Sequence, residues 1–407
     1  MKRLRKNHIR KILLSTAFLA LFLDFIVLPS QGQDALREHF PGFVWEASPE
    51  IDPGILYFTN FQSRNVEVSG IGHFLVGIDQ TGAVVLQQAI QGNRAFNFNK
   101  LPDGRYYYYQ VLQGGIGGGG YAINGIYRIL DDDLQVLREI TAKGSLTNTA
   151  PHDFIVQENG NILLISHDVR EMDMTAYGGD SHALVVGAVI QELSPDDEIV
   201  FEWYSWDHLP IEETTIALDA RPPDDAVAYV HPNGLVLDHD NNIIVSARNM
   251  DTLIKIDRIT GEIIWRMGGP KAPHNDFSFI DDPLGGFSHQ HNPVILPNGN
   301  LLLFDNGNLR ENPTTRAVEY EIDQENHTAR LVWSYTDGRF SGTMGSVQRL
   351  PNGNTLINWG SYQGDYPNVT EITRSGDLIL SLTLQPGQFA YRAYRYLSED
   401  LSTQSDK

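Results

Sequence analysis

The chain has 407 residues, no cysteine and a formal net charge of −21 at pH 7. This acidity argues against nucleic acid and anionic membrane surfaces as partners, because both carry the same sign of charge. The lack of cysteine excludes disulfides, a cysteine nucleophile, a lipid-anchoring cysteine and thiolate metal sites. The chain is longer than a usual domain built around one hydrophobic core. A single domain of this length is expected only if it consists of repeats that stack against one another.

The N-terminus has a pattern typical of a signal peptide. Basic residues are frequent between positions 2 and 11, an apolar run follows over residues 12–23, and residues 30–32 offer a small-x-small pattern, Ser-Gln-Gly, before a cleavage site. We therefore predict an exported protein, periplasmic or secreted, after removal of residues 1–32. Asp24 leaves the apolar run short for a spanning helix, so no stable membrane association is expected. An uncleaved anchor is the alternative.

A tight polar turn that leads into an apolar strand recurs five times along the chain. Asn-Gly and Asp-Gly pairs supply the positive φ angles of hairpin turns, and flanking Val, Ile and Leu residues supply the strands. We call these the leading hairpins. Their turns lie at residues 101–104, 158–161, 240–242, 297–300 and 351–354.

A second hairpin signature lies between successive leading hairpins, with apolar residues alternating around an Asp-x-x-Gly turn. We call these the trailing hairpins, and the clearest runs from Ile254 to Trp265. Units of four strands that recur every few dozen residues are typical of β-propellers, in which each blade buries its face against the next. The six trailing hairpins centre on Gly82, Leu134, Asp197, Gly261, Asn326 and Gly376.

The mismatch between six trailing and five leading hairpins indicates a ring closed by strands from both chain ends. The alternating segment 389–396 could complete the blade that residues 55–61 or 76–86 begin. No segment of helical length and period interrupts the hairpins, so we predict an all-β protein, a six-bladed β-propeller. The predicted divisions are the signal peptide over 1–32, an N-terminal segment over 33–54, the propeller over 55–397 and a C-terminal tail over 398–407.

Histidines recur a few residues before the strands that open successive repeats. His152 precedes the second leading hairpin, His231 the third, and the pair His289 and His291 the fourth. Equivalent positions in successive blades are related by the ring axis, so we expect these side chains to meet in the central funnel. Arg248 follows the third leading turn on the next strand and is expected to point the same way.

The pair His289 and His291 leaves a metal site open as an alternative. If both lay in a strand, residues two apart would face the same side, where they could bind zinc or copper. The nearest carboxylates are those of Asp153 and Asp305, and Arg248 is an unusual neighbour for a cation. The favoured prediction is therefore a site without metal or cofactor.

Aromatic residues fall into two groups by position. Three tryptophans occupy the same place in successive trailing hairpins and are predicted to pack between blades: Trp203, Trp265 and Trp333. Four other aromatic side chains lie in or near loops and are candidates to line a pocket for an aromatic ligand: Tyr177, Trp206, Phe287 and Trp359.

Several short motifs occur in a fixed order along the repeats: His152-Asp-Phe, His231-Pro-Asn-Gly, Ser-Ala-Arg248, Gln-His291 and the segment 303–307. With the hairpins, this set resembles the bacterial aryl-sulfate sulfotransferase family, most strongly from about residue 151 to 360. The resemblance implies a six-bladed propeller that moves a sulfuryl group from a phenolic sulfate to a phenol, without a nucleotide donor.

The resemblance also implies roles for individual residues. His291 matches the histidine that is transiently sulfated in that family, and His152, His231 and Arg248 match its sulfuryl-binding residues. Better-known members carry an extra N-terminal β-domain that builds a dimer, and a disulfide. This chain has little room for that domain between Gln33 and Ile55 and has no cysteine, so the oligomeric state is left open.

Two other functions fit the same residues. A binding or sensor propeller would use the cationic funnel to capture an anionic ligand without turnover, since propellers often serve as docking surfaces. A metal-dependent hydrolase would use the histidines as ligands. Within the favoured function, the sequence names neither the donor nor the acceptor, and water could compete as acceptor.

Overall fold

The computed structural model describes residues 42–62, 72–91, 94–114, 123–219, 226–362, 364 and 366–397. The predicted signal peptide and C-terminal tail lie outside these residues. None of the helices in these ranges is long and apolar enough to cross a membrane.

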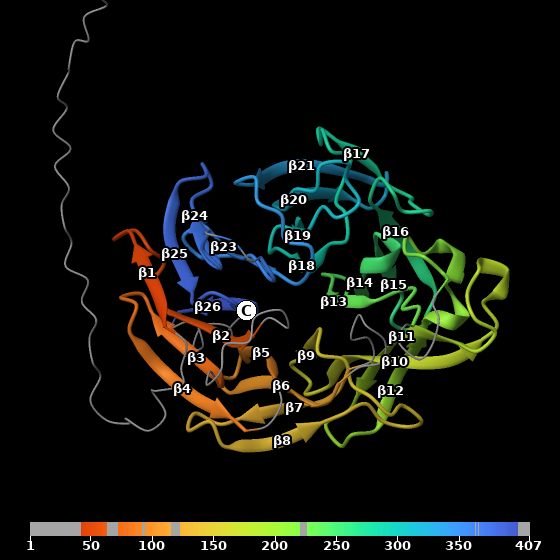
Figure 1. Ribbon diagram of the computed structural model, residues 1–407, viewed down its shortest axis with the longest axis horizontal. Coiled ribbons are helices and arrows are strands. Elements are labelled where there is room, and N and C mark those ends of the chain that lie inside the picture. The colour runs from red at the N-terminus through yellow and green to blue at the C-terminus, as the bar shows by residue number, and fades with distance from the viewer. Residues whose placement is uncertain are drawn as a thin grey trace, which may run out of the picture. The chain divides into compact units, whose positions relative to one another are not determined.

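Six sheets surround a common centre and form a six-bladed β-propeller (Figure 1). The predicted fold is therefore confirmed. We number the blades along the ring and give the strands of each from the centre outward. Blade 1 contains β26 (Gln388–Tyr396), β2 (Ile55–Gln62), β3 (His73–Asp79) and β4 (Val84–Ile90). Blade 2 contains β5 (Ala95–Lys100), β6 (Tyr106–Gln113), β7 (Asn124–Leu130) and β8 (Val136–Ile140).

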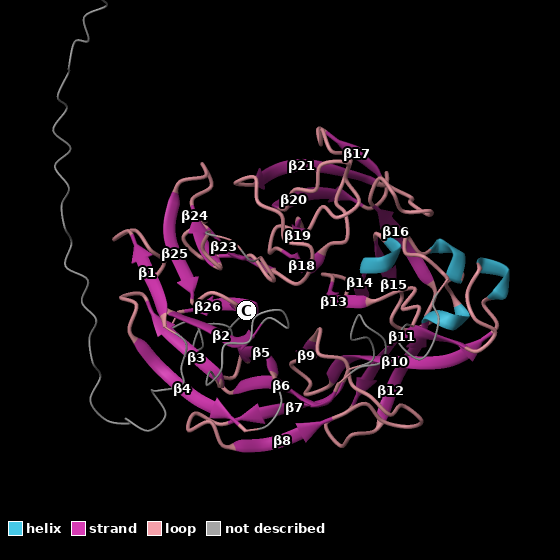
Figure 2. Cartoon of the chain, in the orientation of Figure 1, coloured by secondary structure: helices cyan, strands magenta, loops and turns pink. Residues whose placement is uncertain are grey.

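The next two blades carry four strands each. Blade 3 contains β9 (Phe154–Val156), β10 (Ile162–Met172), β11 (Ala183–Leu193) and β12 (Ile199–Tyr204). Blade 4 contains β13 (Pro232–Leu237), β14 (Ile243–Ala247), β15 (Thr252–Ile256) and β16 (Ile263–Gly268). Four short 3-10 helices lie in the connections of blades 3 and 4 (Figure 2): η1 (Thr175–Tyr177), η2 (Ser205–Asp207), η3 (Ile211–Glu213) and η4 (Arg248–Met250).

The last two blades each gain a fifth, outer strand. Blade 5 contains β18 (His291–Ile295), β19 (Leu301–Asp305), β20 (Arg316–Asp323), β21 (Thr328–Tyr335) and β17 (Ser278–Ile280). Blade 6 contains β22 (Ser346–Arg349), β23 (Thr355–Asn358), β24 (Val369–Ile372), β25 (Leu378–Leu384) and β1 (Phe43–Ala47). Strand β17 runs parallel to β21, whereas the other pairings are antiparallel.

Strands from both chain ends close the ring, as predicted. The C-terminal strand β26 pairs with β2 from Ile55↔Tyr396 to Gln62↔Gln388, which makes it the innermost strand of blade 1. A second closure was not predicted, because β1 pairs with β25 from Phe43↔Leu384 to Ala47↔Leu380. The sheets thus extend N-terminally beyond the predicted boundary at Ile55.

The two hairpin sets lie where the propeller topology requires them. Leading hairpins join the first and second strands of blades 2 to 6, and trailing hairpins join the third and fourth strands of all six blades. Blade 1 has no leading hairpin because β26 and β2 come from opposite ends of the chain. Since antiparallel strands alternate in direction, both hairpin sets lie on one face of the ring, and the remaining connections lie on the other.

The core is divided into clusters that lie within and between blades. The three predicted tryptophans repeat one contact, in which each indole reaches the trailing turn of the next blade. Trp203 donates to Gly261 O at 3.1 Å, Trp265 to Gln324 Oε1 at 3.0 Å, and Trp333 to Arg374 O at 3.0 Å. Their predicted role in packing between blades agrees with these contacts.

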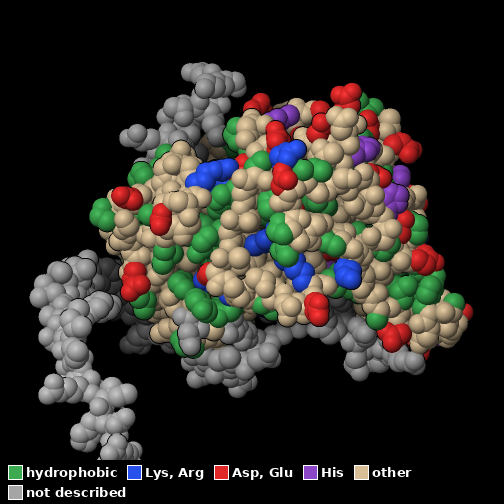
Figure 3. Space-filling view, turned by 90° about the horizontal axis from the view of Figure 1, so that it is seen from above, with side chains coloured by type: hydrophobic (Ala, Val, Ile, Leu, Met, Phe, Trp, Pro, Cys, Tyr) green, Lys and Arg blue, Asp and Glu red, His purple; other side chains and the backbone are tan. Residues whose placement is uncertain are grey.

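On the face of the molecule seen in Figure 3, the acidic side chains are not gathered into one patch. Figure 3 shows Asp and Glu side chains spread across the visible face of the molecule. Several carboxylates are instead buried in ion pairs that join strands. The Lys255 Nζ atom, for example, lies 2.5 Å from Asp238 Oδ2 beneath the leading turn of blade 4.

Candidate functional site

The predicted site residues lie on the loop face, opposite the hairpin turns. His152 precedes β9, His231 directly precedes β13, and His291 begins β18, so each sits where the chain enters the innermost strand of a blade. Arg248 follows β14 as the first residue of η4. Its backbone N–H donates to His231 O at 3.2 Å.

The hydrogen bonds of His291 fix which ring nitrogen carries the proton. The Asn306 Nδ2 group donates to Ser341 O at 2.8 Å and Met344 O at 3.1 Å, so its Oδ1 atom is an acceptor. His291 Nδ1 lies 2.7 Å from that oxygen and must therefore donate. The Nε2 atom keeps its lone pair, which accepts the Met344 N–H at 3.2 Å.

His152 and His231 form a second part of the cluster. Their rings meet edge to face with centroids 5.0 Å apart. The Tyr391 hydroxyl on β26 lies 2.5 Å from His152 Nδ1. Burial lowers the pKa of His152 and of His231 well below the usual value. Electrostatic repulsion from nearby groups, among them His167 and Arg248, lowers both pKa values further. Both rings are therefore neutral at pH 7.

Arg248 brings a permanent positive charge to the same place. Its Nη1 atom donates to Asn249 Oδ1 at 2.7 Å and its Nη2 atom to Gly342 O at 3.2 Å. Burial lowers the pKa of His291 well below the usual value, and the Arg248 charge lowers it further. The same charge also lowers the pKa of His152 and of His231.

An ion pair between Arg392 on the closing strand β26 and Asp153 lies next to this cluster. Arg392 on β26 donates to Asp153 Oδ1 at 2.8 Å and to Asn233 O at 2.9 Å. The Asp153 Oδ2 atom also accepts the backbone N–H of Leu235 at 2.8 Å. Asp153 and Asn233 follow His152 and His231 closely in sequence, so this network holds the starts of two inner strands against the C-terminal strand.

The structure corrects the expected geometry of His289. We expected His289 and His291 to alternate within one strand, but β18 begins only at His291 and His289 has a φ angle of +51°. This left-handed backbone breaks the period of two, so the rings diverge. His289 Nε2 lies 3.0 Å from Thr215 Oγ1, whereas His291 turns to Asn306.

The carboxylates proposed for a metal site are engaged by arginines. Asp153 pairs with Arg392, and Asp305 pairs with Arg310 and with Arg316 at 2.7 Å. Among the residues that the structure describes, no group of three or more His, Asp or Glu side chains is arranged to hold a metal ion.

The four aromatic residues predicted to bind substrate do not gather beside these histidines. Phe287 and Trp359 have 0% exposure and belong to hydrophobic clusters of blades 4 to 6, where they offer no surface to a ligand. Trp206 packs under Arg170, with 4.6 Å from the guanidinium carbon to the ring centroid. Tyr177 is exposed, and its hydroxyl bonds Glu212. Phe287, Trp359 and Trp206 are therefore used in packing, and Tyr177 is not.

The comparison with known families agrees with this geometry. The family model described as arylsulfotransferase (ASST) matches residues 50–394, which is most of the chain and all six blades. The chain belongs to the arylsulfotransferase family. This membership supports aryl sulfotransferase activity in general and phenolic substrates. A search of curated proteins finds no match.

One solved structure shares the arylsulfotransferase's fold at low sequence identity, and another resembles it more weakly. A protein of unknown function from Bacteroides caccae superposes with a TM-score of 0.52 at 12% identity, over 86% of this chain and 100% of that one. A catalytically inactive virginiamycin B lyase from Staphylococcus aureus, solved with quinupristin, gives a TM-score of 0.42 at 11% identity, over 84% and 88%. Identities this low show the fold alone.

Sequence reasoning missed several residues of this arylsulfotransferase site. Asn306 lies within the motif 303–307 but received no role, although it sets the tautomer of His291. Tyr391 and Arg392 were read only as part of a closing strand, yet both contact site residues. The alternation of 389–396 gave the strand, but nothing in it indicated which side chains face the funnel.

Proposed function

We propose that this arylsulfotransferase moves a sulfuryl group from a phenolic sulfate ester to a phenol through a sulfated His291. The observation that carries the proposal is the tautomer of His291. A neutral ring that donates through Nδ1 has its lone pair on Nε2, which acts as the nucleophile once the Met344 N–H turns from Nε2 to a sulfuryl oxygen. Arg248 lies close enough to lower the pKa of this ring and to attract a sulfate ester.

In the first step, the Nε2 atom of His291 attacks sulfur as the bond between sulfur and the phenolic oxygen breaks. The bonding electrons leave on the phenolate, and the sulfuryl group stays on Nε2. The imidazole ring becomes positive, and the Asn306 oxygen stabilises it through the Nδ1–H bond. Sulfuryl transfer resembles phosphoryl transfer in its loose, in-line transition state.

Charge on the peripheral sulfuryl oxygens needs donors that are already in place. Arg248 supplies a planar set of N–H groups, and the Met344 N–H lies 3.2 Å from the atom that receives the group. His152 and His231 supply N–H donors from neutral rings. Fixed donors of this kind stabilise the transition state without reorganising during the reaction.

In the second step, the acceptor phenol attacks the sulfuryl group and the electrons of the nitrogen–sulfur bond return to Nε2. The proton of the acceptor passes to the neutral ring of His152 or His231, and from there to solvent. Because the sulfuryl group waits on the enzyme, no nucleotide sulfate donor is required. Residues 1–32 support the further proposal that this chemistry takes place outside the cytoplasm.

Initial-rate kinetics with two substrates test this proposal. 4-Nitrophenyl sulfate is the donor, and phenol is the acceptor, each varied at several fixed concentrations of the other. A route through a sulfated enzyme predicts parallel double-reciprocal lines and faster nitrophenol release as phenol is added. Intersecting lines would contradict the covalent route. Binding of the sulfate ester without any turnover would instead support the sensor function.

A further inference from the structure

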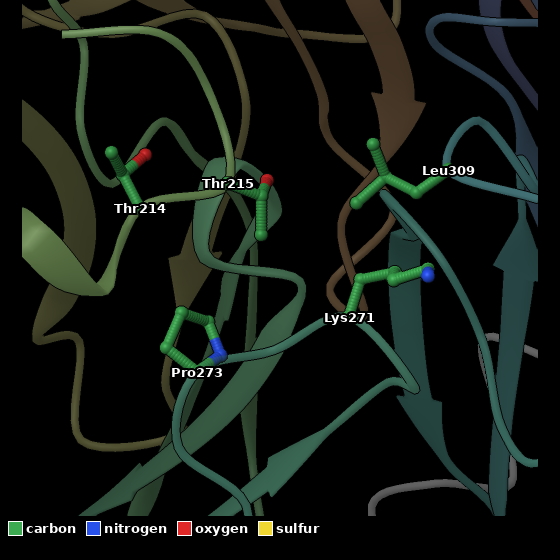
Figure 4. Close-up of a pocket in the computed structure, with 5 residues that line it drawn as sticks. All are labelled: Thr214, Thr215, Lys271, Pro273 and Leu309. Carbon is green, nitrogen blue, oxygen red and sulfur yellow. The ribbon is translucent and has the colours of Figure 1, made fainter.

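A pocket opens on the loop face between the connections of blades 3, 4 and 5. Its volume is about 260 Å³, and its lining residues are Thr214, Thr215, Lys271, Pro273 and Leu309. Figure 4 shows Thr214 and Pro273 on one side of the view, Lys271 and Leu309 on the other, and Thr215 between them. The four aromatic residues predicted to bind substrate are not among its lining residues.

The threonine side of this pocket is tied directly to the catalytic cluster. Thr214 Oγ1 and Thr215 Oγ1 donate to Asn249 O at 3.0 and 2.8 Å, and Asn249 is the residue after Arg248. Thr215 Oγ1 also lies 3.0 Å from His289 Nε2. Because its hydroxyl proton is given to Asn249, Thr215 accepts from the His289 ring.

The leucine side reaches Arg248 by a second route. Leu309 N donates to Ser288 Oγ at 3.0 Å, which holds the leucine beside the segment that leads into β18. The preceding residue, Asn308, donates to Gly342 O at 2.9 Å. Arg248 Nη2 donates to the same carbonyl at 3.2 Å. Hydrogen bonds therefore connect both sides of the pocket to Arg248: the threonines through the next residue, Asn249, and the leucine side through the carbonyl of Gly342.

The pocket carries the positive charge of Lys271, although the chain as a whole is strongly acidic. Among the described residues, no carboxylate forms an ion pair with Lys271. Two acids of the same connections have other partners, since Glu213 Oε2 lies 2.8 Å from Arg266 Nη1 and Asp276 Oδ1 lies 3.3 Å from His274 Nε2. Lys271 is exposed at the pocket and available to an anion that enters it.

We propose that this pocket holds the aromatic ring of the phenolic substrate and that Lys271 selects rings with an anionic substituent, such as a carboxylate. The inference rests on the function proposed above. Pro273 and Leu309 offer apolar surface to a ring, and the threonines offer polar atoms at its edge. The volume of about 260 Å³ falls below the roughly 300–1,000 Å³ of pockets for drug-sized ligands, which suits one substituted ring.

The test compares two acceptors that differ in one charge. 4-Nitrophenyl sulfate serves as the common donor, and 4-hydroxybenzoate and neutral 4-hydroxybenzamide serve as acceptors. The ratio of kcat/KM for the acid to that for the amide is measured in the wild type, Lys271→Gln and Lys271→Arg. We expect Lys271→Gln to lower this ratio about two- to fivefold, mainly through KM, as for an exposed ion pair. Lys271→Arg should restore it, and high salt should weaken the preference.

A matched control is Lys100→Gln, which removes the same charge on the hairpin face beside Tyr106. Its ratio should equal that of the wild type. An unchanged ratio in Lys271→Gln, or an equal drop in Lys100→Gln, would overturn the proposal. Leu309→Trp provides a steric test, because filling the pocket should raise KM for both acceptors; an unchanged KM would also contradict the proposal.

Failure of the pocket and failure of the proposed function can be told apart. If the wild type releases no nitrophenol, the sulfotransferase mechanism is wrong. Calorimetry of 4-hydroxybenzoate binding to the wild type and Lys271→Gln then still tests the pocket without turnover. Weaker binding by the variant supports the assignment of Lys271, and equal affinity or no binding by either protein overturns it.

Discussion

The hairpin face and the loop face of the propeller connect the same strands in different ways. On the hairpin face, each leading or trailing turn stays within its own blade and closes over a few residues. On the loop face, connections such as the one from β12 to β13 are long, and their side chains reach other blades. His152 of blade 3, for instance, contacts Tyr391 of blade 1, 239 positions away in sequence.

This difference separates stability from chemistry. Turn residues on the hairpin face bond to the backbone of their own turns, as Asn298 Oδ1 does to Asn300 N at 3.2 Å. Residues on the loop face meet only because the ring is closed, which brings groups from several blades around Arg248. We therefore expect substitutions on the hairpin face to change unfolding, and substitutions on the loop face to change turnover.

The largest effect is expected for His291→Ala. Loss of the nucleophile removes the covalent route, and turnover of 4-nitrophenyl sulfate should fall by about 10⁴-fold or more, as when other enzymes lose a nucleophile. Asn298→Ala, on the hairpin face of the same blade, is the control and should keep near wild-type kcat. His289→Ala should be milder than His291→Ala. An inactive His289→Ala beside an active His291→Ala would show that the wrong histidine was chosen.

Arg248→Lys should have the next largest effect. The substitution keeps the charge and loses the planar set of donors, so kcat should fall about 10²-fold, as when an oxyanion donor is removed. Arg105→Lys makes the same change on the hairpin face, where Arg105 pairs with exposed Asp103, and should leave kcat unaltered. Equal losses in both variants would remove the distinction between the faces.

The charge of Arg248 also predicts a change in pH dependence. His291 reacts only as the neutral ring, and burial together with Arg248 keeps its pKa below the usual value. The acid limb of kcat/KM should therefore lie below pH 6.5 in the wild type. Arg248→Gln should move this limb to higher pH, because a neighbouring positive charge no longer disfavours protonation. A limb that stays in place would contradict the assigned proximity.

Gly82→Ala tests the hairpin face at the ring closure. Gly82 has a φ angle of +86°, and an added Cβ would lie 2.7 Å from the Trp45 ring on β1. The left-handed backbone alone costs roughly 1 to 2 kcal/mol, and the contact with Trp45 adds to it. Urea unfolding should show this loss, while kcat per folded molecule stays near wild type. A fall in kcat without a loss of stability would contradict the claim that the hairpin face serves stability and not turnover.

The last expected effect concerns acid stability. Burial lowers the pKa of His167 to about 4, so below pH 6.5 the unfolded chain binds a proton that the folded protein does not. Stability is therefore complete above pH 6.5 and is lost as the pH falls toward 4, by on the order of 1 to 3 kcal/mol for this residue. His167→Gln should flatten the slope of unfolding free energy between pH 6.5 and 4.5. Since Asp251, with its pKa raised to about 7, acts in the opposite direction, the variant must be compared with the wild type.

The two faces also differ in how well the sequence predicts them. The hairpins were predictable because their signals are local, with residues such as Gly104 and Gly299 at the positive φ angles that the turns require. Counting the two hairpin sets also gave the closure by β26. Strand β1 was not predicted, because five residues that pair with β25 carry no turn signal of their own.

The site was predictable only in part. The positions of His152, His231, His291 and Arg248 relative to the strands indicated that they would meet. Their partners could not be found that way, because contacts such as that between His291 and Asn306 depend on how blades are rotated against each other. The alternation argument for His289 was wrong, because a non-glycine residue with positive φ interrupts the strand pattern at that position.

The most direct test of the account is to locate the sulfuryl group on the enzyme. The protein is mixed with 4-nitrophenyl sulfate in the absence of acceptor, quenched at alkaline pH and digested, and the peptides are analysed by mass spectrometry. The account predicts one added SO₃ group on the peptide that contains His291, with fragment ions that assign it to His291, and its loss when phenol is added before the quench. Nitrophenol release with an unmodified His291, or an SO₃ group on His152, His231 or His289 instead, would contradict it.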